Sequence, residues 1–380
     1  MKKKILKMTM LLVIVLSLTG CWDYVGLNEI TIITGIAIDK DPKTNKYDLT
    51  FEFVDLGGSA KDKTVSTKMI ETTGTTIFDA VRNAKKRVMN KLYFSNAEVI
   101  IISKDIAKSI GIKSVINWFV RDAELRETIN LIISDEKKAK DVLEGCVVDG
   151  TSTAFEVKKI VESDNIVTSS TKSVELYKAY NAIESKTQAL VLPLFSKVKN
   201  DNKEAVEATG LAVFKKDKQI GDLNAVESKY YLFINNSIKG GILPLKYDSK
   251  NDTSNNVSLE ISNSTTTKSF SYKDGKIKLF ILTNTEVFLG EFDEQDHSLD
   301  ETDIGKIEKE AEKMLKKNML KVIEKSKKKF KHDIFGFSNI VYEHDPKLWN
   351  KINKNWDKLF MKADIEVISK VNITNSALLK

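Results

Sequence analysis

Hydrophobic and polar positions follow two different periods along the first half of this 380-residue chain. Strands are predicted where apolar and β-branched residues run together or recur at every second position: Glu29–Asp39, Tyr47–Asp55, Ala97–Ser103 and Glu127–Ser134. Helices are predicted where apolar residues recur at every third or fourth position: Thr76–Asn90, Asp105–Val120, Asp135–Glu144 and parts of Thr151–Ser185. The Lys/Ser/Thr-rich stretch after Gly57 and Gly58 is predicted to be an exposed loop. This alternation of elements predicts a mixed sheet covered by helices.

The pattern changes near Lys199–Lys203, a short polar run that follows a strand-like segment, Ala189–Val198, broken at Pro193. Longer alternating segments beyond it predict antiparallel strands: Glu207–Lys215, Tyr230–Asn235, Gly241–Tyr247, Val257–Asn263, Lys268–Tyr272 and Lys276–Leu289. The last two are joined by Lys273-Asp274-Gly275, which is typical of a hairpin turn. A long amphipathic helix, a helix with two tryptophans and a final strand follow: Asp303–Phe330, Lys347–Phe360 and Ala363–Asn372.

These elements together predict an α+β fold. We expect a mixed sheet with helices in the N-terminal region, and a largely antiparallel sheet packed on the long helix in the C-terminal domain. Three units are predicted: residues 1–20 as a signal peptide, residues 21–200 as an N-terminal region with room for two subdomains, and residues 203–375 as a C-terminal domain.

The first twenty residues have the character of a secretory signal peptide. Four lysines among the first seven residues precede an apolar run from Thr9 to Leu18, which is shorter than the ~20 residues that a membrane-spanning helix needs. Small residues then lead directly to a cysteine, in the order Leu18-Thr19-Gly20-Cys21. This resembles the bacterial lipobox, in which the cysteine thiol is joined to diacylglycerol and becomes the new N-terminus. We therefore predict that Cys21 is lipidated and holds the protein on the outer face of a membrane; the alternative is an ordinary secreted protein with a chance cysteine near the cut.

Removal of the signal peptide takes away four lysines and lowers the formal net charge from +7 to +3. So small a charge gives no reason to expect a nucleic acid partner. The four prolines and the ordinary apolar share predict a chain with folded cores. With Cys21 acylated, Cys146 has no partner for a disulfide, and its apolar neighbours favour a buried structural thiol over a nucleophile.

Few residues are candidates for catalysis or for metal binding. The three histidines, His297, His332 and His344, have no second ligand at a zinc-like spacing. The acidic stretch before His297 lacks the pattern of a calcium loop, which favours a solvated acidic turn. No phosphate-binding loop follows Gly57, and the sequence contains no nucleophile elbow. We therefore predict no enzyme, no catalytic residue, no metal and no cofactor, and a secreted hydrolase has no support.

The long helix is rich in lysine, above all from Lys325 to Lys331. One interpretation is a basic face near anionic lipid headgroups. The other is a solvated helix surface with ion pairs four residues apart, such as Glu312–Lys316 and Glu324–Lys328. The interleaved acids favour the second interpretation, while the role of the Lys325–Lys331 run stays open.

The tryptophans fall into two groups. Trp349 and Trp356 lie seven residues apart on one helix face and are predicted to pack in a core. Trp22 stands beside Cys21, where an indole suits the headgroup level of a bilayer. The tether from Trp22 to Glu29 spans at most ~28 Å, so the folded body is expected to stay close to the membrane.

Four blocks of sequence carry a resemblance to a known family. They are Cys21-Trp22-Asp23 with Gly35-Ile36-Ala37-Ile38-Asp39; Trp118–Arg126; Gly210–Lys218 with Gly221-Asp222-Leu223; and Asp333-Ile334-Phe335-Gly336-Phe337 with Trp349 and Trp356 beyond it. Together, in this order, they resemble the Ger(x)C family, the C-subunit lipoproteins of spore germinant receptors. Ser338 departs from the family, whose members often have glycine there.

The resemblance implies a non-catalytic subunit with a fold peculiar to its family. It also implies assembly with two integral-membrane partners, the A and B subunits of the receptor, in the inner membrane of the spore, and a role in the response to nutrients. Neither the residues nor the resemblance says whether this subunit touches the germinant. The alternative is a substrate-binding lipoprotein of an ABC transporter, but such proteins need two parallel α/β lobes around a cleft.

Within the blocks, some side chains have predicted structural roles. The charged residues between Arg121 and Arg126 are expected to form a network at a helix end, which either holds the fold or faces a partner, with the first favoured. Asp333 is expected to cap or turn the chain after the long helix. Gly336 is expected to permit a tight backbone between two core phenylalanines.

Overall fold

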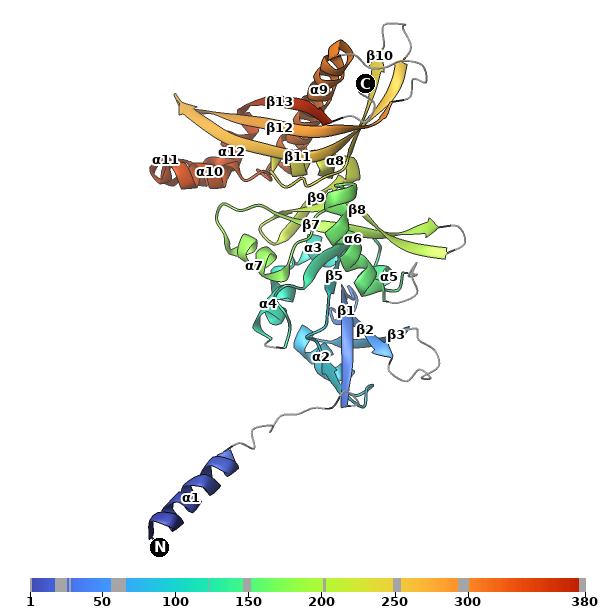
Figure 1. Cartoon of the computed structure of the whole chain (residues 1–380), viewed down its shortest axis with the longest axis vertical. Coiled ribbons are helices and arrows are strands. Elements are labelled where there is room, and N and C mark those ends of the chain that lie inside the picture. Colours follow the sequence, from blue (N-terminus) through green and yellow to red (C-terminus); the bar gives the residue numbers. More distant parts are fainter. Residues whose placement is uncertain are drawn as a thin grey trace.

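Two β-sheets follow one another along the long axis of the molecule (Figure 1). The structure is a computed structural model, and it describes residues 2–17, 26, 29–55, 66–122, 124–145, 152–200, 203–248, 254–292 and 301–375. Cys21, Trp22, Cys146 and His297 lie outside these residues. The predicted signal peptide contains helix α1 (Lys2–Ser17). Within the described part of the chain, no helix is long and apolar enough to cross a membrane.

The first sheet has nine strands. They are β1 (Ile30–Lys40), β2 (Tyr47–Asp55), β3 (Ser66–Gly74), β4 (Lys91–Tyr93), β5 (Val99–Ser103), β6 (Asn130–Ser134), β7 (Leu190–Asn200), β8 (Lys203–Lys215) and β9 (Lys218–Asn224). Their order is β3-β2-β1-β5-β6-β7-β8-β9, with β4 paired to β1. The strands β1, β5, β6 and β7 run parallel, and antiparallel strands extend the sheet on both sides. The predicted mixed sheet is confirmed.

Helices cover both faces of the first sheet. One face carries α2 (Ile77–Ala84), α3 (Lys104–Ser109), α4 (Lys113–Arg121) and α7 (Leu176–Glu184); the other carries α5 (Ala139–Leu143) and α6 (Thr153–Val167). On β5, Ile100 and Ile102 enter the first core while Val99 and Ile101 enter the second. A strand covered on both faces needs apolar residues at every position, which explains the unbroken apolar run of β5.

The second sheet has four strands in the order β10-β11-β12-β13. They are β10 (Ile242–Asp248), β11 (Ser254–Lys273), β12 (Lys276–Phe292) and β13 (Asp364–Asn375). The first three are antiparallel and β13 is parallel to β12. In the hairpin between β11 and β12, Asp274 and Gly275 have φ values of 51° and 75°, as the predicted tight turn requires.

The helices of the C-terminal half are α8 (Ala225–Ile234), α9 (Glu301–Lys325), α10 (Phe337–His344), α11 (Pro346–Ile352) and α12 (Trp356–Lys362). The long helix α9 buries the predicted apolar face against the second sheet: Ile307, Ala311, Leu315, Met319 and Val322. A π-helical turn, Ser326–Phe330, follows α9, and the chain leaves it through a left-handed residue, Lys331 (φ 51°).

The two halves share strands β8 and β9. These strands extend the first sheet, yet Leu211, Val213 and Leu223 belong to the C-terminal core. The domain boundary predicted near residues 200–203 falls at the tip of the β7–β8 hairpin, where Asn200 pairs with Lys203. The division into two domains stays a prediction, and the structure adds that one sheet runs through the predicted boundary.

The strand predicted at Tyr230–Asn235 is wrong, because this segment belongs to helix α8. A capping box starts the helix: Asn224 Oδ1 accepts from the Glu227 N–H (2.9 Å), and Glu227 Oε2 accepts from the Asn224 N–H (3.0 Å). Residues 230–234 are all buried. Because these five consecutive residues are all covered, this part of the helix shows no polar face, and the sequence therefore lacks the helical period.

Smaller differences concern the ends of elements. The loop predicted after Gly57 contains β3, an edge strand. The strands predicted at Val257–Asn263 and Lys268–Tyr272 are parts of the single strand β11, because the serines and threonines between them pair with β12. Pro193 lies inside β7 and does not break it; the neighbouring strand β6 pairs with β7 only from Leu194 onward. The tryptophan-bearing helix is divided into α11 and α12 by a 3₁₀ turn.

Candidate functional site

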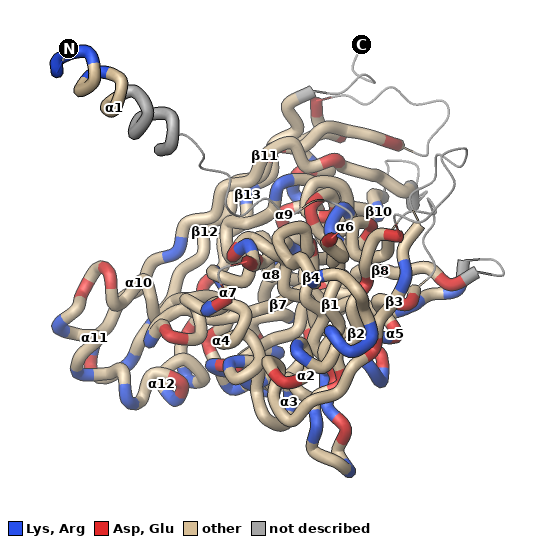
Figure 2. The backbone as a smooth tube through the Cα atoms, turned by 90° about the horizontal axis from the view of Figure 1, so that it is seen from below, with Lys and Arg blue, Asp and Glu red and all other residues tan. Residues whose placement is uncertain are grey.

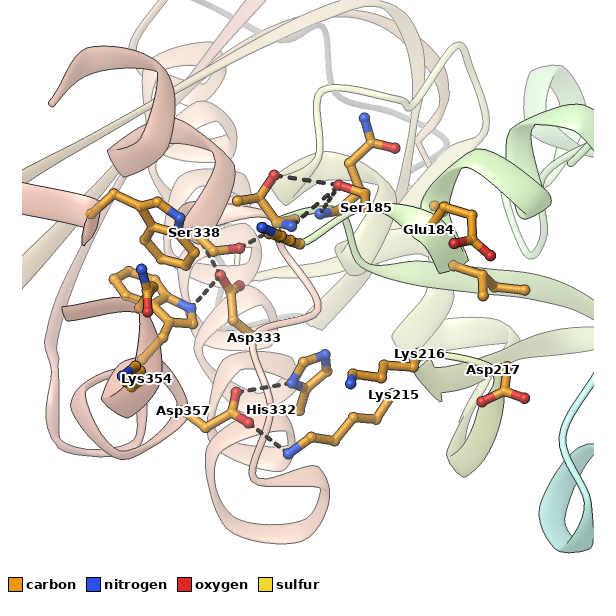
Figure 3. A pocket seen from close by; sticks show the side chains of 18 of the residues that line it. Glu184, Ser185, Lys215, Lys216, Asp217, His332, Asp333, Ser338, Lys354 and Asp357 are labelled. Carbon is orange, nitrogen blue, oxygen red and sulfur yellow. Dashed lines mark hydrogen bonds and ion pairs between the residues drawn. The ribbon is translucent and has the colours of Figure 1, made fainter. Parts of the chain in front are cut away.

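A polar cleft of about 1010 Å³ lies where the first sheet meets the C-terminal helices (Figure 3). Its walls come from distant parts of the sequence: the segments Ala182–Gln188, Lys215–Asp217 and Asn353–Lys358, together with Lys113, His332, Asp333, Ser338 and Trp349. Lysines outnumber carboxylates among these residues. Because both halves of the chain contribute, the cleft exists only when they are folded against one another.

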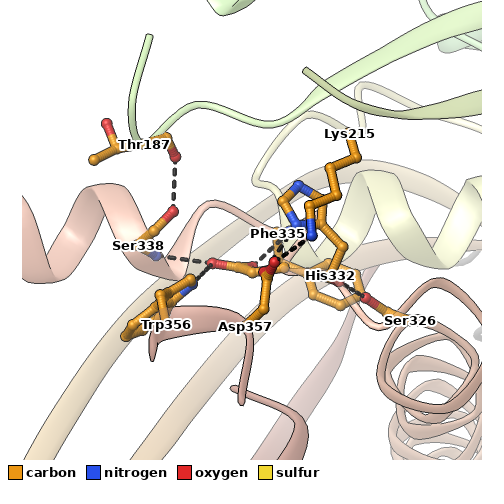
Figure 4. Close-up of polar contacts among 9 residues, drawn as sticks. Thr187, Lys215, Ser326, His332, Phe335, Ser338, Trp356 and Asp357 are labelled. Carbon is orange, nitrogen blue, oxygen red and sulfur yellow. Dashed lines mark hydrogen bonds and ion pairs between the residues drawn. The ribbon is translucent and has the colours of Figure 1, made fainter. Parts of the chain in front are cut away.

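Asp333 organises the inner wall of the cleft (Figure 3), and its partners Phe335, Ser338 and Trp356 are labelled in Figure 4. Its side chain is 2 % exposed. Oδ1 accepts from the Phe335 N–H (3.0 Å), and Oδ2 accepts from the Ser338 N–H (2.8 Å) and from Trp356 Nε1–H (3.1 Å). The predicted role of Asp333 in turning the chain after the long helix is confirmed. The same carboxylate also fixes Trp356, whose ring packs on Trp349 with centroids 5.6 Å apart, as the sequence predicted for a tryptophan core.

Two hydrogen bonds join the halves at this wall. Ser338 Oγ donates to the carbonyl oxygen of Thr187 (2.7 Å), and Thr187 Oγ1 donates to Asn339 Oδ1 (2.8 Å). Thr187 belongs to the segment before β7, whereas Ser338 begins α10. The hydroxyl of Ser338 therefore gives this chain a hydrogen bond between the halves that a glycine at this position cannot provide.

A charged cluster lies at the mouth of the cleft. Asp357 Oδ1 lies 2.9 Å from His332 Nδ1, and Asp357 Oδ2 accepts from Lys215 Nζ (2.6 Å). Burial raises the pKa of Asp357, but the hydrogen bonds from His332 and Lys215 outweigh it and lower the pKa below its usual range. The cluster is a charge-paired bridge between the β8–β9 turn and α12.

Replacement of Asp357 by asparagine is expected to lower the free energy of unfolding by about 1 kcal/mol at neutral pH. Because the carboxyl has a lower pKa in the folded state, the unfolded chain takes up the proton first as the pH falls. The contribution of Asp357 is therefore complete above the unfolded value of 3.8 and is lost below it. Denaturant unfolding of the native protein and the asparagine variant, measured across this pH range, should give free energies of unfolding that converge in acid. A difference between the two that stays constant with pH would contradict the charge-based explanation.

Gly336 begins α10 with a left-handed backbone (φ 73°, ψ 27°) between Phe335 and Phe337, which are 1 % and 0 % exposed. This is the tight backbone that the sequence predicted. A Cβ added at Gly336 would meet nothing within 4 Å, so a larger residue suffers only from the backbone conformation.

Gly336→Ala is therefore expected to lower the free energy of unfolding by about 1 kcal/mol. Gly305→Ala is the matched control, because Gly305 lies in α9 with equally open surroundings. Gly305→Ala should raise the free energy of unfolding by about 0.5–1 kcal/mol, because alanine favours a helix more than glycine does. Denaturant midpoints of the two variants that shift in the same direction would contradict this account.

Two buried carboxylates hold helix starts in the N-terminal half. Asp39, at the end of the Gly35–Asp39 block, accepts from the Ala139 and Lys140 N–H groups (2.7 and 3.1 Å) at the start of α5. Burial raises the pKa of Asp39, against the lowering effect of these bonds. Glu52 is 0 % exposed on β2 and accepts from Thr34, Thr67, Ser152, Thr153 and Ala154.

The lysine run after α9 is largely engaged within the fold. Lys325 pairs with Glu227 of α8, Lys327 Nζ donates to the Ala363 carbonyl (2.8 Å), and Lys328 pairs with Glu324 (2.8 Å), as the sequence predicted. Glu312 instead accepts from the Val371 N–H of β13 (3.2 Å). These contacts give Lys325–Lys328 a structural role at the joint between α9, α8 and β13.

The predicted charge network between Arg121 and Arg126 is only partly present. Glu124 pairs with Lys91 of β4, and Asp122 Oδ1 accepts from the Glu124 N–H (2.9 Å). Arg121 and Arg126 are exposed and form no ion pair with any residue that the structure describes. The acidic members therefore hold the fold, and the arginines face outward.

The hydroxyl groups beside the His332–Asp357 pair are engaged in other contacts. The His332–Asp357 pair lacks a nucleophile, since Ser338 Oγ is engaged with Thr187 and Ser185 Oγ accepts from the Thr187 and Gln188 N–H groups (3.2 and 3.1 Å). Across the described ranges, no three His, Cys, Asp or Glu side chains are placed to hold a metal ion. The arrangement suits a binding or bridging surface.

Comparisons with known proteins agree over both halves of the chain. Residues 23–197 match the model of the spore germination protein N-terminal domain, and residues 209–377 match that of the spore germination B3/GerAC like, C-terminal family. The chain is 25 % identical to spore germination protein KC of Bacillus subtilis over all of its own length and 97 % of that protein. It is 28 % identical to spore germination protein A3 of the same organism, over 94 % of each chain.

A solved structure gives the same result for the fold. The crystal structure of the GerBC protein superposes with a TM-score of 0.57 at 20 % identity, covering 90 % of this chain and 97 % of that one. The α+β fold predicted from the sequence is confirmed. The chain belongs to the Ger(x)C family of spore germination proteins.

Proposed function

We propose that this chain is the non-catalytic lipoprotein subunit of a nutrient germinant receptor. In this proposal Cys21 carries the lipid, the folded body lies on the outer face of the spore inner membrane, and the integral-membrane A and B subunits are its partners. The observation that carries the proposal is the match to germination proteins along the full length of the chain, together with the lipobox at Cys21.

The internal contacts support a structural rather than a chemical role. Asp333, Asp39 and Glu52 fix turns and helix starts, and Asp357 is hydrogen-bonded to His332 and paired with Lys215. Polar side chains used in this way stabilise one conformation of the folded body. Such a body holds or gates its membrane partners through its shape.

The alternative, a substrate-binding lipoprotein of an ABC transporter, is less well supported. Such proteins enclose their ligand between two parallel α/β lobes. Here the second sheet has three antiparallel strands and only β13 is parallel to its neighbour. Calorimetry that shows tight binding of a nutrient to the protein alone would favour this alternative.

The test of the proposed function is genetic. Spores that lack this gene and its paralogues are expected to lose the response to one class of nutrient, and the native gene should restore it. A trigger that bypasses nutrient receptors is the control and should act normally. An unchanged nutrient response in these spores would contradict the proposal.

A further inference from the structure

The exposed residues of α2 and of the turn after it form a surface at the edge of the fold, where the Phe78 ring lies near Trp118 of α4 with centroids 6.3 Å apart. We call it the α2 surface: Phe78, Arg82, Lys85, Lys86, Arg87 and Met89. Phe78 is 48 % exposed and Met89 is 94 % exposed. Single exposed apolar residues are common, but here they stand among four cations.

The α2 surface carries four cations and only one neighbouring acid on the same helix, Asp79, whose pKa is lowered by hydrogen bonds from Thr75 and Asn83 and by the charge of Lys86. The sequence has no Asp or Glu between Arg82 and Asn90. Lys85 Nζ donates to the Met89 carbonyl (3.0 Å), Lys86 Nζ donates to Asn83 Oδ1 (2.9 Å), and Arg87 donates to a backbone carbonyl. The Arg82 guanidinium lies over the Phe78 ring, 4.9 Å from its centre. Among the described residues, none of these four cations forms an ion pair.

The α2 surface also lies where the chain enters the folded body. The turn that carries Met89 leads directly into β4, and β4 pairs with the first residues of β1: Lys91 is opposite Ile30. Asn90 Nδ2 contacts the Ile30 carbonyl (3.5 Å). Ile30 is only nine positions after Cys21, so the tether spans at most about 32 Å when extended. Figure 2 looks at this end of the molecule and shows basic segments around α2.

We propose that the α2 surface lies against the anionic headgroups of the membrane to which Cys21 is anchored. This inference rests on the proposed lipid anchor. The cations supply attraction to anionic lipid, and Phe78 and Met89 supply apolar groups that can enter the headgroup region. The lysines of α9 are less suited to this role, because α9 lies at the opposite end of the long axis (Figure 1). Contact through α2 would orient the cleft and the second sheet away from the bilayer.

The experiment uses the full-length, lipidated chain in vesicles of phosphatidylcholine that contain a photoactivatable phosphatidylglycerol. After illumination, mass spectrometry locates the attached lipid. The test variant carries Arg82→Glu, Lys85→Glu and Lys86→Glu; the matched control carries Lys316→Glu, Lys317→Glu and Lys321→Glu, which are exposed residues of α9. Circular dichroism verifies that both variants are folded.

In the native chain, we expect lipid label at residues 77–91 and little label on α9. In the test variant, the amount of label at residues 77–91 should fall about tenfold. The control variant should keep it. Label on the tether with none at 77–91 would overturn the α2 surface while leaving the anchor intact. A native chain that washes off the vesicles at high salt would overturn the anchor, and this inference with it. Equal labelling of both variants at residues 77–91 would show that charge does not direct the contact, and this result would also overturn the proposed membrane contact. A partner protein with an acidic face would then be the occupant of the α2 surface to examine.

Discussion

Replacement of Glu52 by alanine is expected to lower the free energy of unfolding by about 3–5 kcal/mol. The carboxylate is fully buried and accepts from the Thr34 and Ser152 hydroxyls (2.7 Å each) and from the Thr153 and Ala154 N–H groups (2.8 and 3.1 Å). Alanine leaves the Ser152 hydroxyl and the two N–H groups without these acceptors in a buried place, whereas the Thr34 hydroxyl keeps the backbone carbonyl of residue 52 (3.3 Å). The substitution also removes the negative charge at the start of α6.

Denaturant unfolding measures this loss. Glu71→Ala is the matched control, because Glu71 lies on the neighbouring strand β3, is exposed, and pairs with Lys140 at the surface (3.2 Å). Surface ion pairs contribute about 0–1 kcal/mol, so the control should shift the midpoint little. Similar midpoints for the two variants would show that Glu52 does not hold α6 in place.

The second large effect concerns Cys21. Cys21→Ala is expected to abolish the incorporation of labelled palmitate into the protein and to leave residues 1–20 attached, because lipidation at the thiol precedes the cut in lipoproteins of this kind. Each buried methylene of an acyl chain contributes ~0.8 kcal/mol, and the variant loses this contribution, although the retained apolar run Thr9–Leu18 can still enter the bilayer. The nutrient response of the spore should fall in parallel.

Cys146→Ala is the control, since the sequence has only these two cysteines. It should incorporate palmitate like the native chain, and its N-terminus should be the modified Cys21. A label that is lost from the Cys146 variant and kept in the Cys21 variant would contradict the assignment of the anchor.

Local patterns in the sequence predicted most of the elements. The unbroken apolar run of β5, the amphipathic face of α9 and the Asp274-Gly275 turn each follow from residues that are close together in the chain, and each is where the pattern predicted. Asp333 and Gly336 also appear with their predicted roles, because the Phe335 and Ser338 N–H groups that Asp333 fixes are at most five residues away.

Contacts between distant parts of the sequence could not be predicted from local patterns. Glu52 looks like one polar position of an alternating strand, and its partners on α6 are about a hundred residues away. The cleft likewise joins Thr187 to Ser338 and Lys215 to Asp357 across 151 and 142 residues. A strand was predicted in place of the second half of helix α8, because the C-terminal core covers residues 230–234 on every side. In each case the sequence does not show which distant segment packs against a given strand or helix.

The central claim is that this chain works as an anchored subunit beside membrane partners. The most direct measurement is affinity isolation of the tagged native chain from spore membranes in mild detergent, followed by mass spectrometry. We predict that the A and B subunits of one receptor co-isolate with the native chain, and that both are depleted when the Cys21→Ala chain is used. Isolation of the native chain alone, while another membrane complex of the same spores stays intact, would contradict the claim.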